Sequence, residues 1–190
     1  NKTTCYIGSA NATTGRLIRT TNGGATWVDI SANVTGLTGT VRGIHFIDEN
    51  TGWISNSAGR IYKTTDGGTT WSESYYIGST TVTIYEVKFI DANNGFALTT
   101  AGRVLKTTNG GTDWTLTQTD ATKNLFGLGI LGVRSRDNEA SVPILIGGDA
   151  GTAIKSMDNG ATWQLVHYAA SQELLLRSSF PSENVGYVVG

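Results

Sequence analysis

Short apolar segments alternate with polar turns along the whole chain, and they recur in the same order. In the second of these cycles the apolar positions predict four strands, at residues 41–47, 52–56, 60–64 and 70–74. Each segment has the length of a strand and is rich in β-branched and aromatic residues, which favour strands. The pattern therefore predicts an all-β fold built from a repeating four-stranded unit.

The clearest repeated element is an eight-residue segment that occurs four times, at residues 20–27, 64–71, 107–114 and 156–163. Its pattern is Ser/Thr, any residue, Asp/Asn, any residue, Gly, any residue, Thr/Asp, Trp, and we call these segments the repeat turns. Their Trp residues lie 44, 43 and 49 residues apart, a spacing typical of a four-stranded propeller blade. The residues that define the pattern are Thr20, Asn22, Gly24, Trp27, Thr64, Asp66, Gly68, Trp71, Thr107, Asn109, Gly111, Trp114, Ser156, Asp158, Gly160 and Trp163.

The chemistry of the repeat turns suits a tight connection between the third and fourth strands of each unit. Asp and Asn side chains can accept hydrogen bonds from turn amides, and Gly can adopt the positive φ that such a hairpin needs. The Trp is expected to begin the fourth strand and to fill space between neighbouring sheets. Asn22 and Asn109 cannot act as general acids or bases, so we interpret this position as structural and not catalytic.

The repeat turns resemble the Asp-box, also called the bacterial neuraminidase repeat, of sialidases, sortilin-type receptors, xyloglucan-active glycoside hydrolases and photosystem II assembly-factor propellers. The longer phrase, seen in Ile44–Asp48, Gly52-Trp53 and Gly59–Trp71, is most similar to the assembly-factor-like propellers and their secreted bacterial relatives. The resemblance implies a β-propeller of four-stranded antiparallel blades with Asp-box turns between strands three and four. It defines no single function, because the same turn occurs in enzymes, receptors and assembly factors.

We expect one propeller domain over residues 1–190, with an enlarged loop at 132–143 that accounts for the longest Trp spacing. Propellers with such repeats commonly have about 6 to 8 blades, so we expect an incomplete segment of a larger ring. Its terminal strand edges would then be open to self-association. The expected parts are a partial blade at 1–31, full blades at 32–75, 76–119 and 120–167, and a partial blade at 168–190.

Composition narrows the function classes. Lys and Arg total 14 against 15 Asp and Glu, a formal net charge of -1, so the chain as a whole does not attract nucleic acid or anionic membranes. No apolar run approaches the roughly 18 residues of a membrane span, and we expect no direct membrane insertion. Cys5 is the only cysteine, which excludes an internal disulfide and a Cys-based zinc site. We expect no cofactor and no metal, since the Gly-Gly pairs belong to turns or strand ends and not to strand-to-helix junctions.

The candidate binding site is a series of arginines. Arg16, Arg60 and Arg103 occupy the same position of three repeats, at the start of the third strand, and Thr152 replaces them in the fourth. Because Arg binds carboxylates through a rigid bidentate fork, the series could hold a protein or peptide partner. The alternative is that each is a solvated side chain whose stem covers a neighbouring blade. A second basic series in the middle of the third strand is expected to contact neighbouring strands and turns, and it comprises Arg19, Lys63, Lys106 and Lys155.

The sequence does not predict an enzyme. Glycoside hydrolysis needs two facing carboxylates about 5 to 10 Å apart, and the possible carboxylates belong to no local motif. The Arg-Ile-Pro phrase of sialidases is absent. His45 and His167 have no metal-ligating company in the sequence, so we expect both to be packed strand residues. The carboxylates considered are Glu86, Asp120, Asp149 and Glu173.

The function inferred from the sequence is that of a non-enzymatic propeller scaffold that binds a protein or peptide, in a secreted or cell-surface bacterial protein. Three alternatives stay open: a sialidase-like or xyloglucanase-like glycoside hydrolase with catalytic residues mostly outside this segment, a photosystem II assembly factor, and a structural repeat module of an extracellular assembly. Low Lys content and richness in Thr, Asn and Gly favour the secreted or surface location, with the periplasm or the thylakoid lumen as alternatives.

Overall fold

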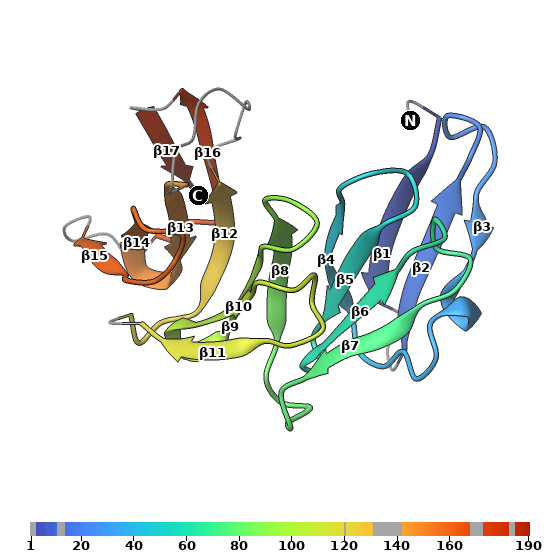
Figure 1. The fold of residues 1–190 in the computed structure, drawn as a ribbon, viewed down its shortest axis with the longest axis horizontal. Coiled ribbons are helices and arrows are strands. Elements are labelled where there is room, and N and C mark those ends of the chain that lie inside the picture. The colour runs from blue at the N-terminus through green and yellow to red at the C-terminus, as the bar shows by residue number, and fades with distance from the viewer. Residues whose placement is uncertain (1–2, 11–13, 120, 131–141, 168–172, 183–184) are drawn as a thin grey trace. The chain divides into compact units, whose positions relative to one another are not determined.

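The computed structural model describes residues 3–10, 14–119, 121–130, 142–167, 173–182 and 185–190. In these ranges the regular structure consists of strands and short 3-10 turns (Figure 1), and no described helix is long and apolar enough to cross a membrane. Strands that follow one another in the chain are neighbours in each sheet. This confirms the predicted all-β fold of antiparallel sheets. The 3-10 turns are Ser31–Asn33, Thr100–Gly102 and Asp149–Gly151.

The chain divides into two compact units, and each is described by itself. The first unit comprises Asn1–Gly95 and Thr107–Trp114, and the second comprises Phe96–Lys106 and Thr115–Gly190.

The first unit contains a three-stranded sheet in the order β1-β2-β3 and a four-stranded sheet in the order β4-β5-β6-β7. Both are antiparallel meanders, drawn in blue and in cyan to green in Figure 1. The strands predicted at 52–56 and 60–64 match β5 and β6 residue for residue. The strands with their bounds are β1 Cys5–Ala10, β2 Gly15–Thr20, β3 Val28–Asp29, β4 Val41–Phe46, β5 Gly52–Asn56, β6 Arg60–Thr64, β7 Ser72–Tyr76 and β8 Ile84–Phe89.

The start of the fourth strand differs from the prediction, because Trp71 does not begin β7. Strand β7 begins at Ser72, and Trp71 forms an isolated parallel bridge with Val34. Its backbone N–H donates to the carbonyl of Asn33 at 3.1 Å. The backbone of Trp71 thus links the second repeat turn to the segment before β4. The Trp71 side chain is buried, with 4 % exposure.

The core of the first unit lies where the β1-β2-β3 sheet meets the β4–β7 sheet. All five residues of β5 are buried, whereas none of β7 is, because β5 is covered on both faces and β7 is an outer edge strand. This agrees with the buried Trp53 and Ile54 of β5 and with the Ser, Glu and Tyr residues of β7. The buried cluster consists of Leu17, Ile30, Val34, Val41, Ile54, Tyr62 and Trp71.

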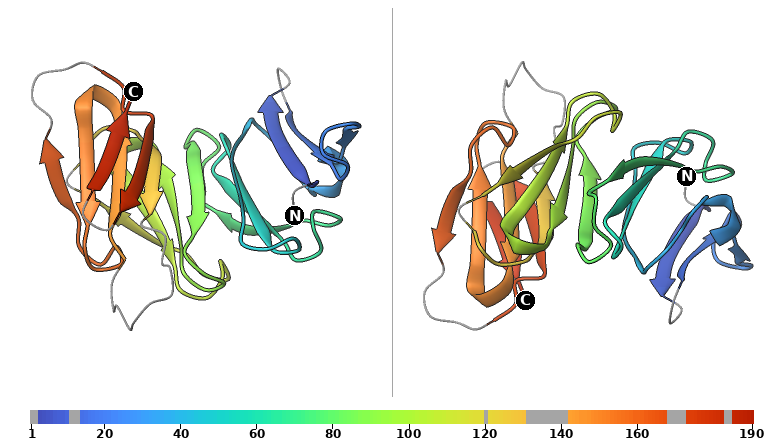
Figure 2. Two further views of the ribbon diagram at one scale, coloured as in Figure 1. Left: turned by 90° about the horizontal axis from the view of Figure 1, so that it is seen from above. Right: turned by 90° about the horizontal axis from the view of Figure 1, so that it is seen from below.

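The second unit contains a four-stranded sheet in the order β12-β13-β14-β15 and a two-stranded sheet, β16-β17. Figure 2 shows the two-stranded sheet, in dark red, lying beside the orange strands of the larger one. The Ser178 hydroxyl on β16 joins them by donating to the carbonyls of Gly127 and Leu145 at 3.0 and 2.9 Å. The remaining described sheet has four strands in the order β11-β10-β9-β8. The strands are β9 Gly95–Thr99, β10 Arg103–Thr107, β11 Thr115–Gln118, β12 Leu125–Ile130, β13 Ile144–Gly148, β14 Thr152–Ser156, β15 Gln164–His167, β16 Arg177–Ser182 and β17 Val185–Val189.

Candidate functional site

The repeat turns connect β2 to β3, β6 to β7, β10 to β11 and β14 to β15, as predicted, and one hydrogen-bond pattern holds all four. In the second turn the buried Thr64 hydroxyl accepts the backbone N–H of Gly68 at 2.9 Å and donates to Asp66 Oδ1 at 2.8 Å. The same Asp66 oxygen accepts the backbone N–H of Thr70 at 2.9 Å. Equivalent bonds at 2.7 to 3.0 Å recur in the other turns. The side chains at positions one and three therefore supply the acceptors for the turn amides.

The side chains at positions three and seven form matched donor and acceptor pairs. Where position three is Asp, position seven is Thr, whose hydroxyl donates to the second carboxylate oxygen. Where position seven is Asp113, position three is Asn109, whose amide donates to it at 2.8 Å. Side-chain and backbone hydrogen bonds from position seven hold the pKa of Asp66 and that of Asp158 at about 2. The hydrogen bonds of both carboxylates are thus made within the turn, which agrees with a structural and not a catalytic role for this position.

The second basic series anchors the second and third repeat turns to the preceding sheet. Arg19 Nη1 on β2 donates to the Gly67 carbonyl at 2.6 Å, and Lys63 Nζ on β6 donates to the Gly110 carbonyl at 2.9 Å. Both acceptors occupy position four of the next repeat turn. The ammonium of Lys63 also lies over the Trp53 ring, 5.3 Å from its centroid. For these two residues the predicted contact with a neighbouring turn is confirmed.

The candidate arginines of the first unit are each neutralised within their own sheet. Arg16 donates to Asp29 Oδ2 at 2.6 Å, and this exposed pair links β2 to β3. Hydrogen bonds from Ser31, and then from Arg16, hold the pKa of Asp29 at about 2. Arg60 forms an ion pair with Glu73 and lies over the Tyr76 ring, 4.0 Å from its centroid.

Arg103, in the second unit, has different surroundings. The carboxylates that pair with Arg16 and Arg60 stand two residues after the Trp of their repeat turns, and Leu116 occupies that place in the third repeat. Arg103 is half-buried at the start of β10, and its Nε is buried with no hydrogen-bond partner in the described part of the chain. No described residue pairs with its guanidinium.

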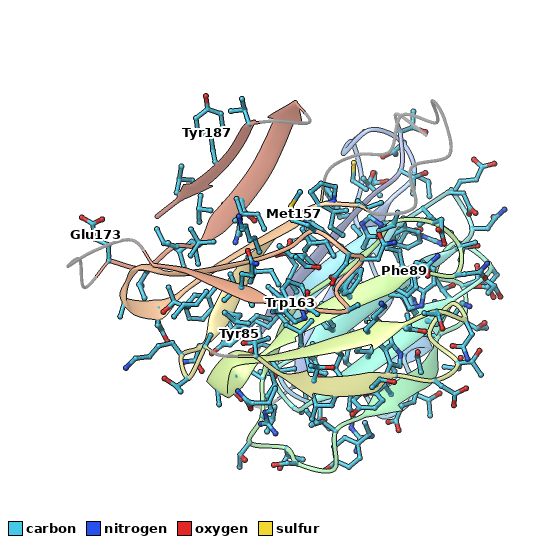
Figure 3. The ribbon with its side chains drawn as sticks, turned by 60° about the vertical axis from the view of Figure 1, so that its left-hand side comes forward. Tyr85, Phe89, Met157, Trp163, Glu173 and Tyr187 are labelled. Atoms are coloured by element: carbon cyan, nitrogen blue, oxygen red, sulfur yellow. The ribbon has the colours of Figure 1, made fainter. Side chains whose placement is uncertain are left out.

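The other candidate residues form no catalytic arrangement among the described residues. Glu86 pairs with Lys88 at 2.8 Å on β8, and no group of three metal-ligating side chains occurs in the described ranges. His45 lies on β4, where burial lowers its pKa, as expected for a packed strand residue. Glu173 is exposed (Figure 3), and its backbone carbonyl accepts the N–H of Gly151. Asp120, most of the 132–143 loop and the side chain of His167 lie outside the described residues.

Comparison with known proteins identifies the fold of the chain but not its activity. No protein-family model matches the sequence, and no curated protein matches it either. Among solved structures, YCF48 bound to D1 peptide shares 18% identity over 95% of this chain and 54% of its own, with a TM-score of 0.68. YCF48 from Cyanidioschyzon merolae gives 18% identity, 92% and 58% coverage and a TM-score of 0.62. The GH74 enzyme of Niastella koreensis gives 15% identity, 95% and 30% coverage and a TM-score of 0.66.

The chain therefore has the β-propeller fold, with blades similar to those of YCF48 and the GH74 enzymes. It spans about half the length of the YCF48 chains that it matches, 54% and 58%, and less than a third of the GH74 chain, 30%. At these identities the likeness concerns the fold alone.

Proposed function

We propose that this chain is part of an Asp-box propeller that binds an acidic protein or peptide, in a secreted or cell-surface protein. The observation that carries the proposal is Arg103. Of the three arginines at the same repeat position, it alone has no carboxylate partner among the described residues. Its Nε, like that of Arg60, is buried without a hydrogen-bond partner in the described part of the chain. A carboxylate of the partner can occupy the place that Asp29 and Glu73 take in the first two repeats.

The proposal gives the three arginines unequal roles. Arg16 and Arg60 must release an internal carboxylate before they can bind another, whereas Arg103 has none to release among the residues that the structure describes. A charged hydrogen bond contributes about 1.5 to 3 kcal/mol, which is about a tenfold to a hundredfold change in affinity. The binding of a D1 peptide by YCF48 supports a peptide as the ligand class. The low Lys content and the richness in Thr, Asn and Gly support the extracellular location.

The test measures binding of a fluorescent acidic peptide with a free carboxyl terminus by anisotropy at low and high salt. The matched control peptide has its acidic residues replaced by amides. Arg103→Ala is expected to weaken binding at least about tenfold and to reduce its salt dependence. Arg60→Ala and Arg16→Ala are expected to have smaller effects. Unchanged binding and salt dependence after replacement of all three arginines by Ala would overturn the site.

The likeness to the GH74 enzymes supports the second candidate, a glycoside hydrolase of sialidase-like or xyloglucanase-like type. Turnover of fluorogenic sialosides or β-glucosides by the complete protein, abolished by one carboxylate substitution, would replace the binding proposal. The YCF48 likeness also supports a photosystem II assembly role, which the same anisotropy assay tests with a D1 peptide as the probe.

A further inference from the structure

The residue two places after the Trp of each repeat turn lies on the fourth strand of its unit, and we call it the flanking residue. In all four repeats it is paired, across the strands, with the residue two places after the position of Arg16, Arg60 and Arg103. Alternate side chains share one face of a strand, so the flanking side chain and the arginine are diagonal neighbours on the same face. The flanking residues are Asp29, Glu73, Leu116 and Leu165.

An acidic flanking residue neutralises the arginine of its own repeat. Asp29 Oδ2 and Arg16 Nη2 are 2.6 Å apart, and Glu73 forms the ion pair with Arg60. In the third repeat the flanking residue is Leu116, which is 37% exposed, and Arg103 has no carboxylate partner among the described residues. The flanking residue thus determines whether the arginine of a repeat is available to a ligand.

Leu116 and Arg103 belong to the middle of the repeat series. Repeat turns precede and follow their own repeat in the sequence. Their strands, β11 and β10, are neighbours in a four-stranded sheet (Figure 1). The exposure of Leu116 is therefore a property of an internal repeat and not of a terminal strand.

The backbone around Arg103 is fixed by side chains of the same unit. Gln118 is paired with Arg103 across the strands, and its side-chain nitrogen donates at 3.0 to 3.2 Å to the carbonyls of Ala101, Thr119 and Ala121. The Thr119 hydroxyl donates to the Gly102 carbonyl at 2.7 Å. None of these bonds involves the guanidinium, so a carboxylate that binds it displaces none of them. The fixed backbone also lowers the entropic cost of binding.

We infer that the third repeat binds an extended peptide in which an acidic and an apolar residue are two places apart. The carboxylate binds Arg103, and the apolar side chain packs on Leu116. Diagonal neighbours on two antiparallel strands are about 7 to 8 Å apart, and residues two places apart on one face of an extended peptide are separated by about 7 Å. The inference rests on the proposed binding of an acidic peptide and specifies which acidic peptide binds.

The other repeats provide the comparison within the same chain. The fourth repeat also has a leucine, Leu165, which is 45% exposed, but Thr152 stands in place of the arginine. It therefore offers an apolar contact without a charge. The first and second repeats have the arginine but pair it with an acid. Among the repeats that the structure describes, the third alone combines an available arginine with an apolar neighbour.

The first test is a titration of the isotope-labelled chain with short peptides, followed through the amide signals of Arg103 and Leu116 in NMR spectra. Three peptides with the same Gly-Ser flanks differ only in their centre: Asp-Ser-Leu, Asp-Leu-Ser and Asn-Ser-Leu. The second peptide has the composition of the first, but its apolar side chain faces the other way. Asp-Ser-Leu is expected to bind about fivefold to tenfold more tightly than Asp-Leu-Ser and at least about tenfold more tightly than Asn-Ser-Leu.

The second test exchanges flanking residues. Leu116→Asp copies the first repeat and supplies Arg103 with an internal carboxylate, so binding of Asp-Ser-Leu should weaken at least about tenfold. Leu165→Asp is the matched control, because it makes the same change in a repeat that has no arginine, and binding should be unchanged. Glu73→Leu copies the third repeat in the second, and it should create a further site that shifts the amide signal of Arg60. Loss of stability cannot produce such a gain.

The outcomes separate this inference from the function on which it rests. If no acidic peptide shifts the signal of Arg103, the proposed binding fails. If Asp-Ser-Leu and Asp-Leu-Ser bind equally well, or if Glu73→Leu creates no site, acidic peptides bind but the role of the flanking residue is overturned. Asp120→Asn tests the candidate carboxylate near this repeat that lies outside the described residues. Its binding should be unchanged, and tighter binding would overturn the availability of Arg103.

Discussion

The hydroxyl at position one of the repeat turn is predicted to contribute more to stability than any other polar group of the turn. Thr64 is only 2% exposed, and its hydroxyl bonds to the Gly68 amide, the Asp66 amide and the Asp66 carboxylate. Thr64→Val removes the hydroxyl at nearly constant volume. Thr64→Ser keeps the hydroxyl and removes the methyl, and Ser156 shows that Ser forms the same bonds in the fourth turn.

The magnitude follows from what each change leaves behind. In Thr64→Val the buried N–H of Gly68 loses its acceptor, which costs about 1 to 3 kcal/mol, and the bond to Asp66 adds about 0.5 to 1.5 kcal/mol. We therefore expect a loss of about 2 to 4 kcal/mol. In Thr64→Ser the loss of one buried methyl costs about 1 kcal/mol.

The assay is urea unfolding followed by Trp fluorescence. It reports mainly on the first unit, which contains Trp27, Trp53, Trp71 and Trp114. With an m-value of about 1 to 3 kcal/mol/M, Thr64→Val should lower the midpoint by about 1 M or more and Thr64→Ser by well under half of that. A Val variant as stable as the Ser variant would refute the view that this hydroxyl holds the turn.

Further predictions concern charge and the contacts between sheets. Asn109→Asp sets a second carboxylate beside Asp113 in place of a 2.8 Å hydrogen bond; it should destabilise by about 0.5 to 1.5 kcal/mol in urea unfolding at pH 7, and an unchanged midpoint would contradict the matching of donor and acceptor. The pKa of Asp66 is about 2 in the folded protein, against its ordinary value of 3.8, so its ionised form stabilises the fold fully above about pH 4 and this stability is lost as pH falls towards 2. Asp66→Asn should therefore flatten the dependence of the unfolding midpoint on pH between about 2 and 4, and an unaltered acid profile would contradict this. Lys63→Met loses the bond to the Gly110 carbonyl and the contact with a Trp ring; we expect a loss of about 1 to 2 kcal/mol by urea unfolding, and no loss would show that the anchor is dispensable.

Much of the local structure could be predicted because it depends on residues close in sequence. The repeat turns and strands β5 and β6 needed only the spacing of Gly, Trp and apolar residues. The position of Trp71 outside β7 could not be predicted from the sequence. Its bridge to Val34 depends on the packing of the turn against a segment 37 residues away. Positions three and seven combine Asp with Thr in two turns, Asn with Asp in one and Asn with Thr in one, and which atom donates follows only from the geometry of the turn.

The ion pairs of the candidate arginines could not be predicted from the repeat pattern alone. Repetition placed Arg16 and Arg60 correctly at the start of a third strand, yet their pairing with Asp29 and Glu73 depends on the cross-strand register. The signal that separates Arg103 is the residue two places after each Trp, which changes from an acid to Leu116 in the third repeat. That signal has meaning only once the register is known.

The anchoring of the second and third repeat turns by the sheets before them makes stability in the first unit a nearest-neighbour property. Arg19 and Tyr6 hold the turn at Gly67, and Lys63 holds the turn at Gly110, so each coupling joins one repeat to the next. Such a chain behaves as a one-dimensional array of coupled repeats. Local unfolding of one repeat lowers the protection of its neighbours from hydrogen exchange, and this effect decreases with distance along the array. Replacement of Tyr6 or Arg19 should therefore raise amide hydrogen exchange more in the turn at Gly67 than in the turn at Gly110.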